Sequence, residues 1–152
     1  MNYYLGLLLF ICFGSISAQT DIETEVKQTI TTFFEGFHKQ DSTIIKSVIY
    51  KDVILQSIGK NRAGIIQLET QDFPKFLKSI VAIPKDQSFE EKLLRYHIQV
   101  DGNMANAWTD YTFWFNGVFS HCGVNSFQLI KENDQWKIFY LVDTRRREDC
   151  DN

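Results

Sequence analysis

The pattern of hydrophobic and polar positions along the chain changes its period near Phe89. From Thr20 to Gln40 apolar side chains recur at spacings of three and four residues, which predicts a helix with one buried face. After Phe89 apolar and polar residues alternate, which is the period of β-strands. Helices followed by long strands indicate an α+β domain with its helices packed on one face of a curved antiparallel sheet.

Capping residues predict where the helices begin. Thr20 and Glu23 form a capping box for the first helix, and Asp41 is placed to cap a short second helix. The run from Asp72 to Pro74 predicts the start of a third, because proline is tolerated in the first turn. Between the second and third helices, the run from Val53 to Ile58 predicts a strand.

The alternating part of the chain predicts four strands joined by tight turns. Asn116 and Gly117 separate two aromatic-rich runs and suit a two-residue type I′ turn, since both positions tolerate positive φ. A second two-residue turn is expected at 133–134 and a three-residue turn at 101–103. The expected strands are Phe89 to Val100, Met104 to Phe115, Val118 to Lys131 and Gln135 to Asp143.

These turns predict a register, and the register predicts two faces. With Phe115 opposite Val118, Asp110 lies opposite Gly123, and Phe127 lies opposite Tyr140. We assign the aromatic face with interspersed polar groups to the concave interior. It is expected to carry Tyr96, Trp108, Asp110, Thr112, Trp114, Phe119, His121, Asn125, Phe127, Trp136, Ile138 and Tyr140.

The opposite face of the predicted sheet is also apolar, and it includes Tyr111, Phe113 and Leu141. Because the helices can cover only one face, the second is expected to meet another copy of the chain. The pattern therefore predicts a homodimer formed through the convex face.

Composition narrows the class of protein. A chain of 152 residues that is 44% hydrophobic suits one globular domain. The net charge of −3 supplies no positive field, so a nucleic-acid partner is not expected. The local run Arg145 to Arg147 could clamp an anionic ligand, or it could be a solvated strand end paired with Glu148 and Asp149.

The first eighteen residues form an apolar run that ends in small residues. This pattern predicts a signal peptide at 1–18, cleavage before Gln19 and a mature domain at 19–152. The run is too short for a good membrane span. The mature protein is expected to be periplasmic or secreted, with no membrane attachment after cleavage.

Export leaves Cys122 and Cys150 in the mature chain, and an oxidising compartment allows them to pair. A disulfide between them is the favoured interpretation, and two free thiols are the alternative. A reactive Cys122 paired with His121 is a third possibility, although neighbours in a strand point to opposite faces. No further ligands stand at zinc-like spacing, so a metal is not expected.

Three runs resemble the NTF2-like superfamily, which includes the SnoaL-like and ketosteroid-isomerase-like proteins. The first helix, the Asp-capped second helix and the first strand of this superfamily resemble the run FFEGFHKQDSTIIKSVIYKDVILQSIG. Its last strand resembles QWKIFYLVDTRR. The small exported bacterial branch named for lumazine binding resembles SHCGVNSFQLIKENDQWKIFYLVDTRRREDC. The resemblance implies a cone-shaped α+β fold, which serves enzymes, binding proteins and assembly modules alike.

The chain departs from this family at the catalytic positions of ketosteroid isomerase. The oxyanion-donating tyrosine aligns with Phe33, which has no hydroxyl. The carboxylate base aligns with Ser57, which cannot take a proton from carbon at neutral pH. A steroid-isomerase mechanism is therefore not supported.

The expected function is non-catalytic binding of a small, largely apolar molecule in the concave pocket, without a cofactor. One alternative is a cofactor-independent lyase, isomerase or hydrolase that uses Asp110 and His121 as an acid/base pair. Another is a dimeric interaction module whose cavity is filled by its own side chains, with the polar groups satisfying one another. The predicted ligand-binding residues are Tyr96, Trp108, Asp110, His121, Asn125 and Tyr140.

Overall fold

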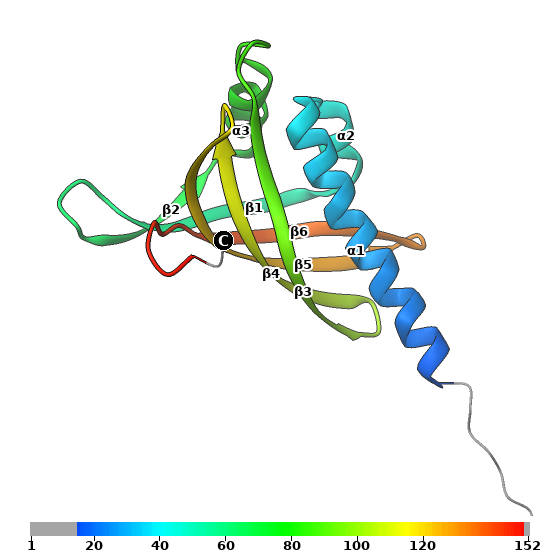
Figure 1. Cartoon of the computed structure of the whole chain (residues 1–152). Coiled ribbons are helices and arrows are strands. Elements are labelled where there is room, and N and C mark those ends of the chain that lie inside the picture. The colour runs from blue at the N-terminus through cyan, green and yellow to red at the C-terminus, as the bar shows by residue number, and fades with distance from the viewer. Residues whose placement is uncertain (1–14, 151–152) are drawn as a thin grey trace, which may run out of the picture.

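Figure 1 shows the protein as a computed structural model that describes residues 15–150. Most of the predicted signal peptide, residues 1–14, lies outside the described residues, as do residues 151–152. Three helices and six strands follow in the order α1, α2, β1, β2, α3 and β3 to β6 within the described part of the chain. The α+β class predicted from the sequence is confirmed.

The helices are α1 (Ser15–Lys39), α2 (Ser42–Ser47) and α3 (Phe73–Val81). Asp41 caps α2 by accepting a 2.8 Å hydrogen bond from the Thr43 N–H, and Asp72 caps α3 by accepting one of 2.9 Å from the Lys75 N–H. The predicted start of α1 at Thr20 is wrong. No glycine or proline lies between Ser15 and Thr20, so nothing in that segment interrupts the helix.

The six strands form one sheet in the order β2-β1-β6-β5-β4-β3. All neighbouring strands are antiparallel except β1 and β6, which are parallel. The sequence pattern did not predict β2, whose residues are all exposed and therefore show no buried face. The strands are β1 (Ile49–Lys60), β2 (Ile66–Gln71), β3 (Phe89–Asp101), β4 (Met104–Phe115), β5 (Val118–Glu132) and β6 (Gln135–Thr144).

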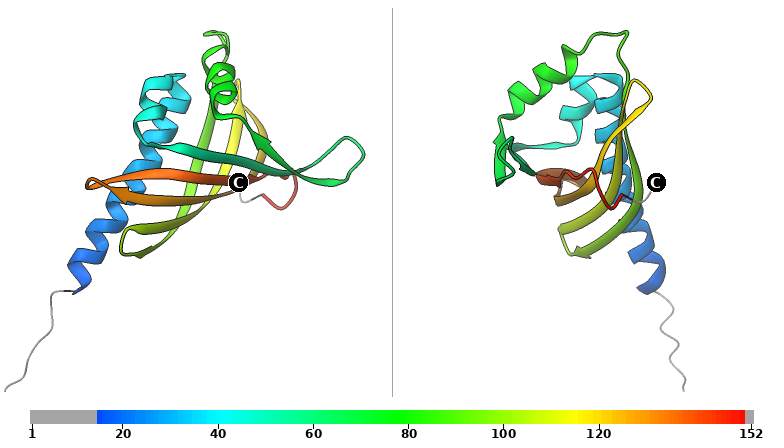
Figure 2. Two further views of the ribbon diagram at one scale, coloured as in Figure 1. Left: turned by 180° about the vertical axis from the view of Figure 1, so that it is seen from behind. Right: turned by 60° about the vertical axis from the view of Figure 1, so that its left-hand side comes forward.

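The helices cover one face of the curved sheet, and α1 runs across its concave side (Figure 2). The core lies between this helix and strands β4 to β6. The Phe33 ring packs edge-on against Phe34 at 5.2 Å, and the Phe34 ring packs against Phe127 on β5 at 6.2 Å. The hairpin of β1 and β2 projects away from this body (Figure 1).

The predicted turn at Asn116 and Gly117 forms, and Phe115 pairs with Val118. Ser120 is then an extra residue on β5, so Phe113 rather than Thr112 lies opposite His121. Because a one-residue bulge reverses the faces of everything beyond it, the predicted faces of β4 are wrong.

Two further expectations about register are wrong. Phe139 is an extra residue on β6, so Phe127 pairs with Leu141 instead of Tyr140. The turn between β3 and β4 has two central residues rather than three, since Asp101 pairs with Met104. Gly102 adopts a φ of 57° in this turn, a left-handed conformation that glycine adopts without steric cost.

These shifts exchange the contents of the two faces on β4. Trp108 and Asp110 lie on the outer face, and Trp108 is 48% exposed. Tyr111 and Phe113, which were expected on the convex dimer face, lie on the concave side together with Leu141 of β6.

The described helices include none that is long and apolar enough to cross a membrane.

Candidate ligand-binding pocket

A cavity of about 260 Å³ opens between α1, α3 and the concave face of the sheet. One side of it is apolar and is formed mainly by aromatic rings from both helices and from β4. We call these rings the phenylalanine wall. The wall consists of Phe33, Phe34, Phe37, Phe76 and Phe113.

The polar part of the pocket lining is organised around Asp143 at the end of β6. Arg145 Nε donates a 2.7 Å hydrogen bond to Asp143 Oδ2, and Ser57 Oγ donates to Asp143 Oδ1. The Tyr111 hydroxyl lies 3.3 Å from Asp143 Oδ2 and donates to the Thr144 carbonyl at 2.9 Å. We call Ser57, Tyr111, Asp143 and Arg145 the Asp143 cluster. Both oxygens of its carboxylate are engaged within the cluster.

Glu91 on β3 is a second acidic group in the pocket. The residue is only partly buried, because part of its surface faces the cavity. Its Oε1 accepts a 2.7 Å hydrogen bond from Asn125 Nδ2 on β5. Burial raises the pKa of Glu91 to about 8, the Asp143 charge acts in the same direction, and the Asn125 bond and Arg145 oppose both. The carboxyl group is therefore largely protonated near neutral pH.

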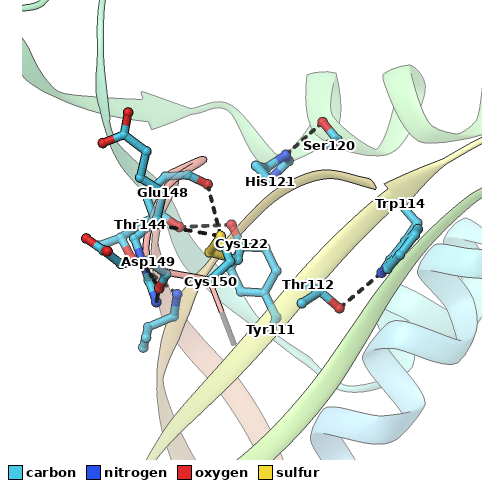
Figure 3. The surroundings of a disulfide bond; sticks show 12 residues. Tyr111, Thr112, Trp114, Ser120, His121, Cys122, Thr144, Glu148, Asp149 and Cys150 are labelled. Carbon is cyan, nitrogen blue, oxygen red and sulfur yellow. Dashed lines mark hydrogen bonds between the residues drawn. A yellow bond between two sulfur atoms is a disulfide. The ribbon is translucent and has the colours of Figure 1, made fainter. Parts of the chain in front are cut away.

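His121 lies in the pocket against two aromatic rings. Its ring stacks on Phe113 at 4.9 Å and meets Tyr111 edge-on at 5.8 Å. Figure 3 shows its Nδ1 next to the Ser120 hydroxyl, at 3.1 Å. Burial lowers the pKa of His121, and the positive charge of Arg145 acts in the same direction. The imidazole is therefore neutral at physiological pH.

Two of the six predicted ligand-binding residues, His121 and Asn125, line the pocket. Asp110 does not approach His121; it lies on the outer face and pairs with Arg95 at 2.7 Å. The predicted acid/base pair of Asp110 and His121 is therefore not formed. Trp108 also lies on the outer face, where it is far too exposed to form a pocket wall.

The other two predicted residues are not among those that line the pocket. Tyr96 faces α1, and the Lys27 Nζ atom lies 4.8 Å from the centre of its ring. The Tyr140 hydroxyl donates a 2.6 Å hydrogen bond to Gln56 Oε1 on β1. The bulge at Phe139 explains why Tyr140 is absent from the pocket lining, because the bulge turns the residues that follow it to the opposite face.

Sequence reasoning missed Glu91 and most of the Asp143 cluster. Glu91 reaches the pocket because Leu94 is an extra residue on β3, which reverses the faces of the residues before it. The only trace of this bulge in the sequence is the adjacent apolar pair Leu93 and Leu94, which breaks the alternation. Phe33 and Ser57, at the isomerase positions, do line the pocket.

The two cysteines come together beside this pocket. Cys122 Sγ and Cys150 Sγ lie 2.02 Å apart, which is disulfide distance, with their Cα atoms 5.8 Å apart (Figure 3). Cys122 pairs across the backbone with Arg146, four residues before Cys150. The described residues contain no group of three or more histidine, cysteine or acidic side chains that could hold a metal ion.

Comparison with known proteins identifies the fold. No family profile matches this sequence, and no curated protein sequence matches it. An NTF2-like protein of unknown function from Shewanella baltica is similar in structure, with a TM-score of 0.60 and 14% identity over 85% of this chain and 97% of that one.

Two further solved structures carry descriptions of activity. A candidate dehydratase of the NTF2-like family from Streptomyces avermitilis has a TM-score of 0.63 and 16% identity over 85% of this chain and 98% of that one. The beta subunit of a candidate aromatic-ring-hydroxylating dioxygenase from Novosphingobium aromaticivorans has a TM-score of 0.66 and 12% identity over 84% and 91%. At these identities the likeness establishes architecture, and the chain therefore has the NTF2-like fold.

Proposed function

We propose that this protein binds a small, largely apolar molecule in the pocket between α1, α3 and the sheet. The observation that carries the proposal is one cavity lined by both the phenylalanine wall and the Asp143 cluster. An apolar enclosure with a few placed polar groups is the usual form of a small-molecule site. The open volume argues against the alternative of a module whose cavity is filled by its own side chains.

Binding is favoured over catalysis by the state of the polar groups. Asp143 accepts hydrogen bonds from Ser57 on Oδ1 and from Arg145 on Oδ2, so both of its oxygens are already engaged within the cluster. The position of the isomerase base is Ser57, and the Asp110–His121 pair is absent. The Asp143 cluster is thus suited to orient a ligand by hydrogen bonds.

Native mass spectrometry of the purified protein tests this proposal. Ser79 on α3 is exposed and lines the pocket, so Ser79→Trp should fill its entrance with an indole ring. We expect the wild type to retain or take up a small molecule and Ser79→Trp to lose it. Lys75→Trp, an exposed position on the same helix outside the pocket, should behave like the wild type. Equal ligand retention by all three proteins would contradict a pocket site.

A second candidate function, acid/base catalysis, is favoured by Glu91. A carboxyl group whose pKa is about 8 can exchange a proton near neutral pH, as a general acid or base requires. Glu91 would then replace Asp110 as the carboxyl of a cofactor-independent lyase, isomerase or hydrolase. The candidate dehydratase among the structural neighbours is consistent with this alternative. Conversion of the retained molecule during incubation would favour it over binding alone.

We also propose that the protein is exported and processed before Gln19, which would place it in the periplasm or outside the cell. The apolar run at the N-terminus and the two cysteines of the mature chain support this location. The same mass measurement on protein from an exporting cell reports whether residues 1–18 have been removed.

A further inference from the structure

We propose that the pocket selects an organic cation, whose positive group pairs with Glu91 while its apolar body lies against the phenylalanine wall. This inference rests on the proposed binding function and names the class of ligand. It follows from the charges of the pocket, the free oxygen of Glu91 and the aromatic rings around it.

The charges that line the pocket balance only while Glu91 is protonated. Asp143 and Arg145 are joined at 2.7 Å and form a neutral pair. Glu91 remains, and within the described residues it forms no ion pair with lysine or arginine. An ionised Glu91 therefore leaves the pocket with one uncompensated negative charge, which a monovalent cation would neutralise.

One oxygen of Glu91 is available to a ligand. Asn125 holds Oε1 at 2.7 Å, whereas no hydrogen bond to Oε2 is formed within the described part of the chain. A carboxylate can accept several hydrogen bonds, so Oε2 has its full capacity left. Asn125 thus positions a pocket-lining carboxyl group whose second oxygen remains available.

Aromatic rings lie near the same position. Phe113 lies directly opposite Glu91 across strands β3 and β4. Phe37 contacts Phe89, two residues before Glu91, at 4.9 Å and stacks with Phe76 at 6.3 Å. The faces of aromatic rings attract cations, and an ammonium group between rings and a carboxylate gains from both. Neutral ligands would use the rings only for apolar contact.

The empty pocket keeps Glu91 protonated because burial raises its pKa to about 8. A bound cation supplies the missing counterion, so the carboxyl proton leaves to solvent as the ion pair forms.

Other groups face this position: His121 from β5, Tyr111 from β4, Asp143 and Arg145 from the end of β6. On α1, His38 Nε2 accepts the Glu91 N–H at 2.9 Å. The two histidines also titrate near neutral pH, so the test must separate them from Glu91.

Calorimetric titration with benzylamine and benzyl alcohol separates charge from shape, because the two molecules have nearly the same size and only the amine is cationic. Between about pH 6 and about pH 8 the ionised fraction of Glu91 rises, and we expect benzylamine affinity to rise about 50-fold. Benzyl alcohol affinity should stay nearly constant. Near neutral pH, benzylamine binding should release about one proton, measured in buffers of different ionisation heat.

Two variants assign this response to Glu91. Glu91→Gln should lose the pH response and the preference for benzylamine while still binding benzyl alcohol, which also shows that it is folded. Asp110→Asn removes a carboxylate from the outer face and should leave both affinities unchanged. Histidine titration persists in both variants.

Three outcomes would overturn the inference. Equal or tighter binding of benzyl alcohol, or a pH response that persists in Glu91→Gln, would show that the pocket binds small molecules without selecting cations. No binding of either molecule would overturn it as well. In that case the retained-ligand measurement with Ser79→Trp decides the proposed function separately.

Discussion

Glu91 couples the pocket to the stability of the whole fold. Its pKa is raised by burial from 4.5 to about 8 in the folded protein. As pH rises above 4.5, the pKa of Glu91 in the unfolded chain, the unfolded chain loses this proton while the folded chain retains it. The stability contributed by the protonated group is therefore complete below about pH 4.5 and is lost progressively as pH rises to about 8.

Glu91→Gln should stabilise the protein. The amide keeps the acceptor for Asn125 and cannot ionise, so the free energy of unfolding at pH 7 should rise by roughly 2–3 kcal/mol. Urea unfolding of both proteins at about pH 5 and about pH 8 measures the effect, and the difference should be small at the lower pH. A variant less stable than the wild type at pH 8 would show that Glu91 is not held as a neutral acid.

Bulges in the strands decide which parts of the site could be predicted. From His121 onward the faces of β5 were predicted correctly, so His121 and Asn125 line the pocket as expected. Phe119 lies before the extra residue Ser120 and packs against Trp114 outside the pocket, so its predicted place on the concave face is wrong. The extra residues Leu94, Ser120 and Phe139 then reverse the faces of the neighbouring strands. Strand alternation and turn residues are local signals, whereas a bulge depends on how a strand must bend to fit the core. The fold class and NTF2-like resemblance could thus be predicted, while the set of pocket residues could not.

The segment after β6 carries Cys150, which lies at disulfide distance from Cys122. Cys122 on β5 and Cys150 are separated by 28 residues in sequence, and a bond between them would restrict the unfolded chain. Loss of such a cross-link costs about 3 kcal/mol. Cys150→Ser should lower the free energy of unfolding by this amount, as measured by denaturant unfolding without reductant.

Reductant provides the matched control for this element. It should destabilise the wild type to the level of Cys150→Ser and leave the variant itself unchanged. Alkylation of two thiols in unreduced, unfolded wild type would show that the cysteines are free. The disulfide would then be absent from the native protein.

The outer face of the sheet carries exposed apolar side chains. Tyr111, Phe113 and Leu141 cannot form a convex dimer surface, because they face the pocket. Other apolar side chains occupy the outer face: Ile54, Ile58 and Leu68 are 48%, 38% and 58% exposed. We propose that a homodimer covers this face, since apolar side chains gathered on one surface favour association.

Light scattering coupled to size-exclusion chromatography should report twice the mass of one chain for the wild type. Ile58→Glu places a charge within the outer face and should give monomers. Ile65→Glu changes an equally apolar residue in the turn after β1 and should leave the dimer intact. A wild-type monomer at micromolar concentration would contradict the proposal.

The hydrogen bond from the Glu91 N–H to His38 Nε2 makes α1 responsive to acid. It joins α1 to the edge strand β3 and exists only while that nitrogen carries no proton. Burial lowers the pKa of His38 in the folded protein below the ordinary histidine value of 6.5. The stability contributed by neutral His38 is therefore complete above pH 6.5 and is lost as pH falls through the lowered pKa. Acid thus weakens the attachment of α1 to β3 at the backbone of Glu91. Rising pH ionises the side chain of the same residue. The two groups therefore act in opposite directions: acid removes the His38 contribution to stability, and rising pH removes the Glu91 contribution.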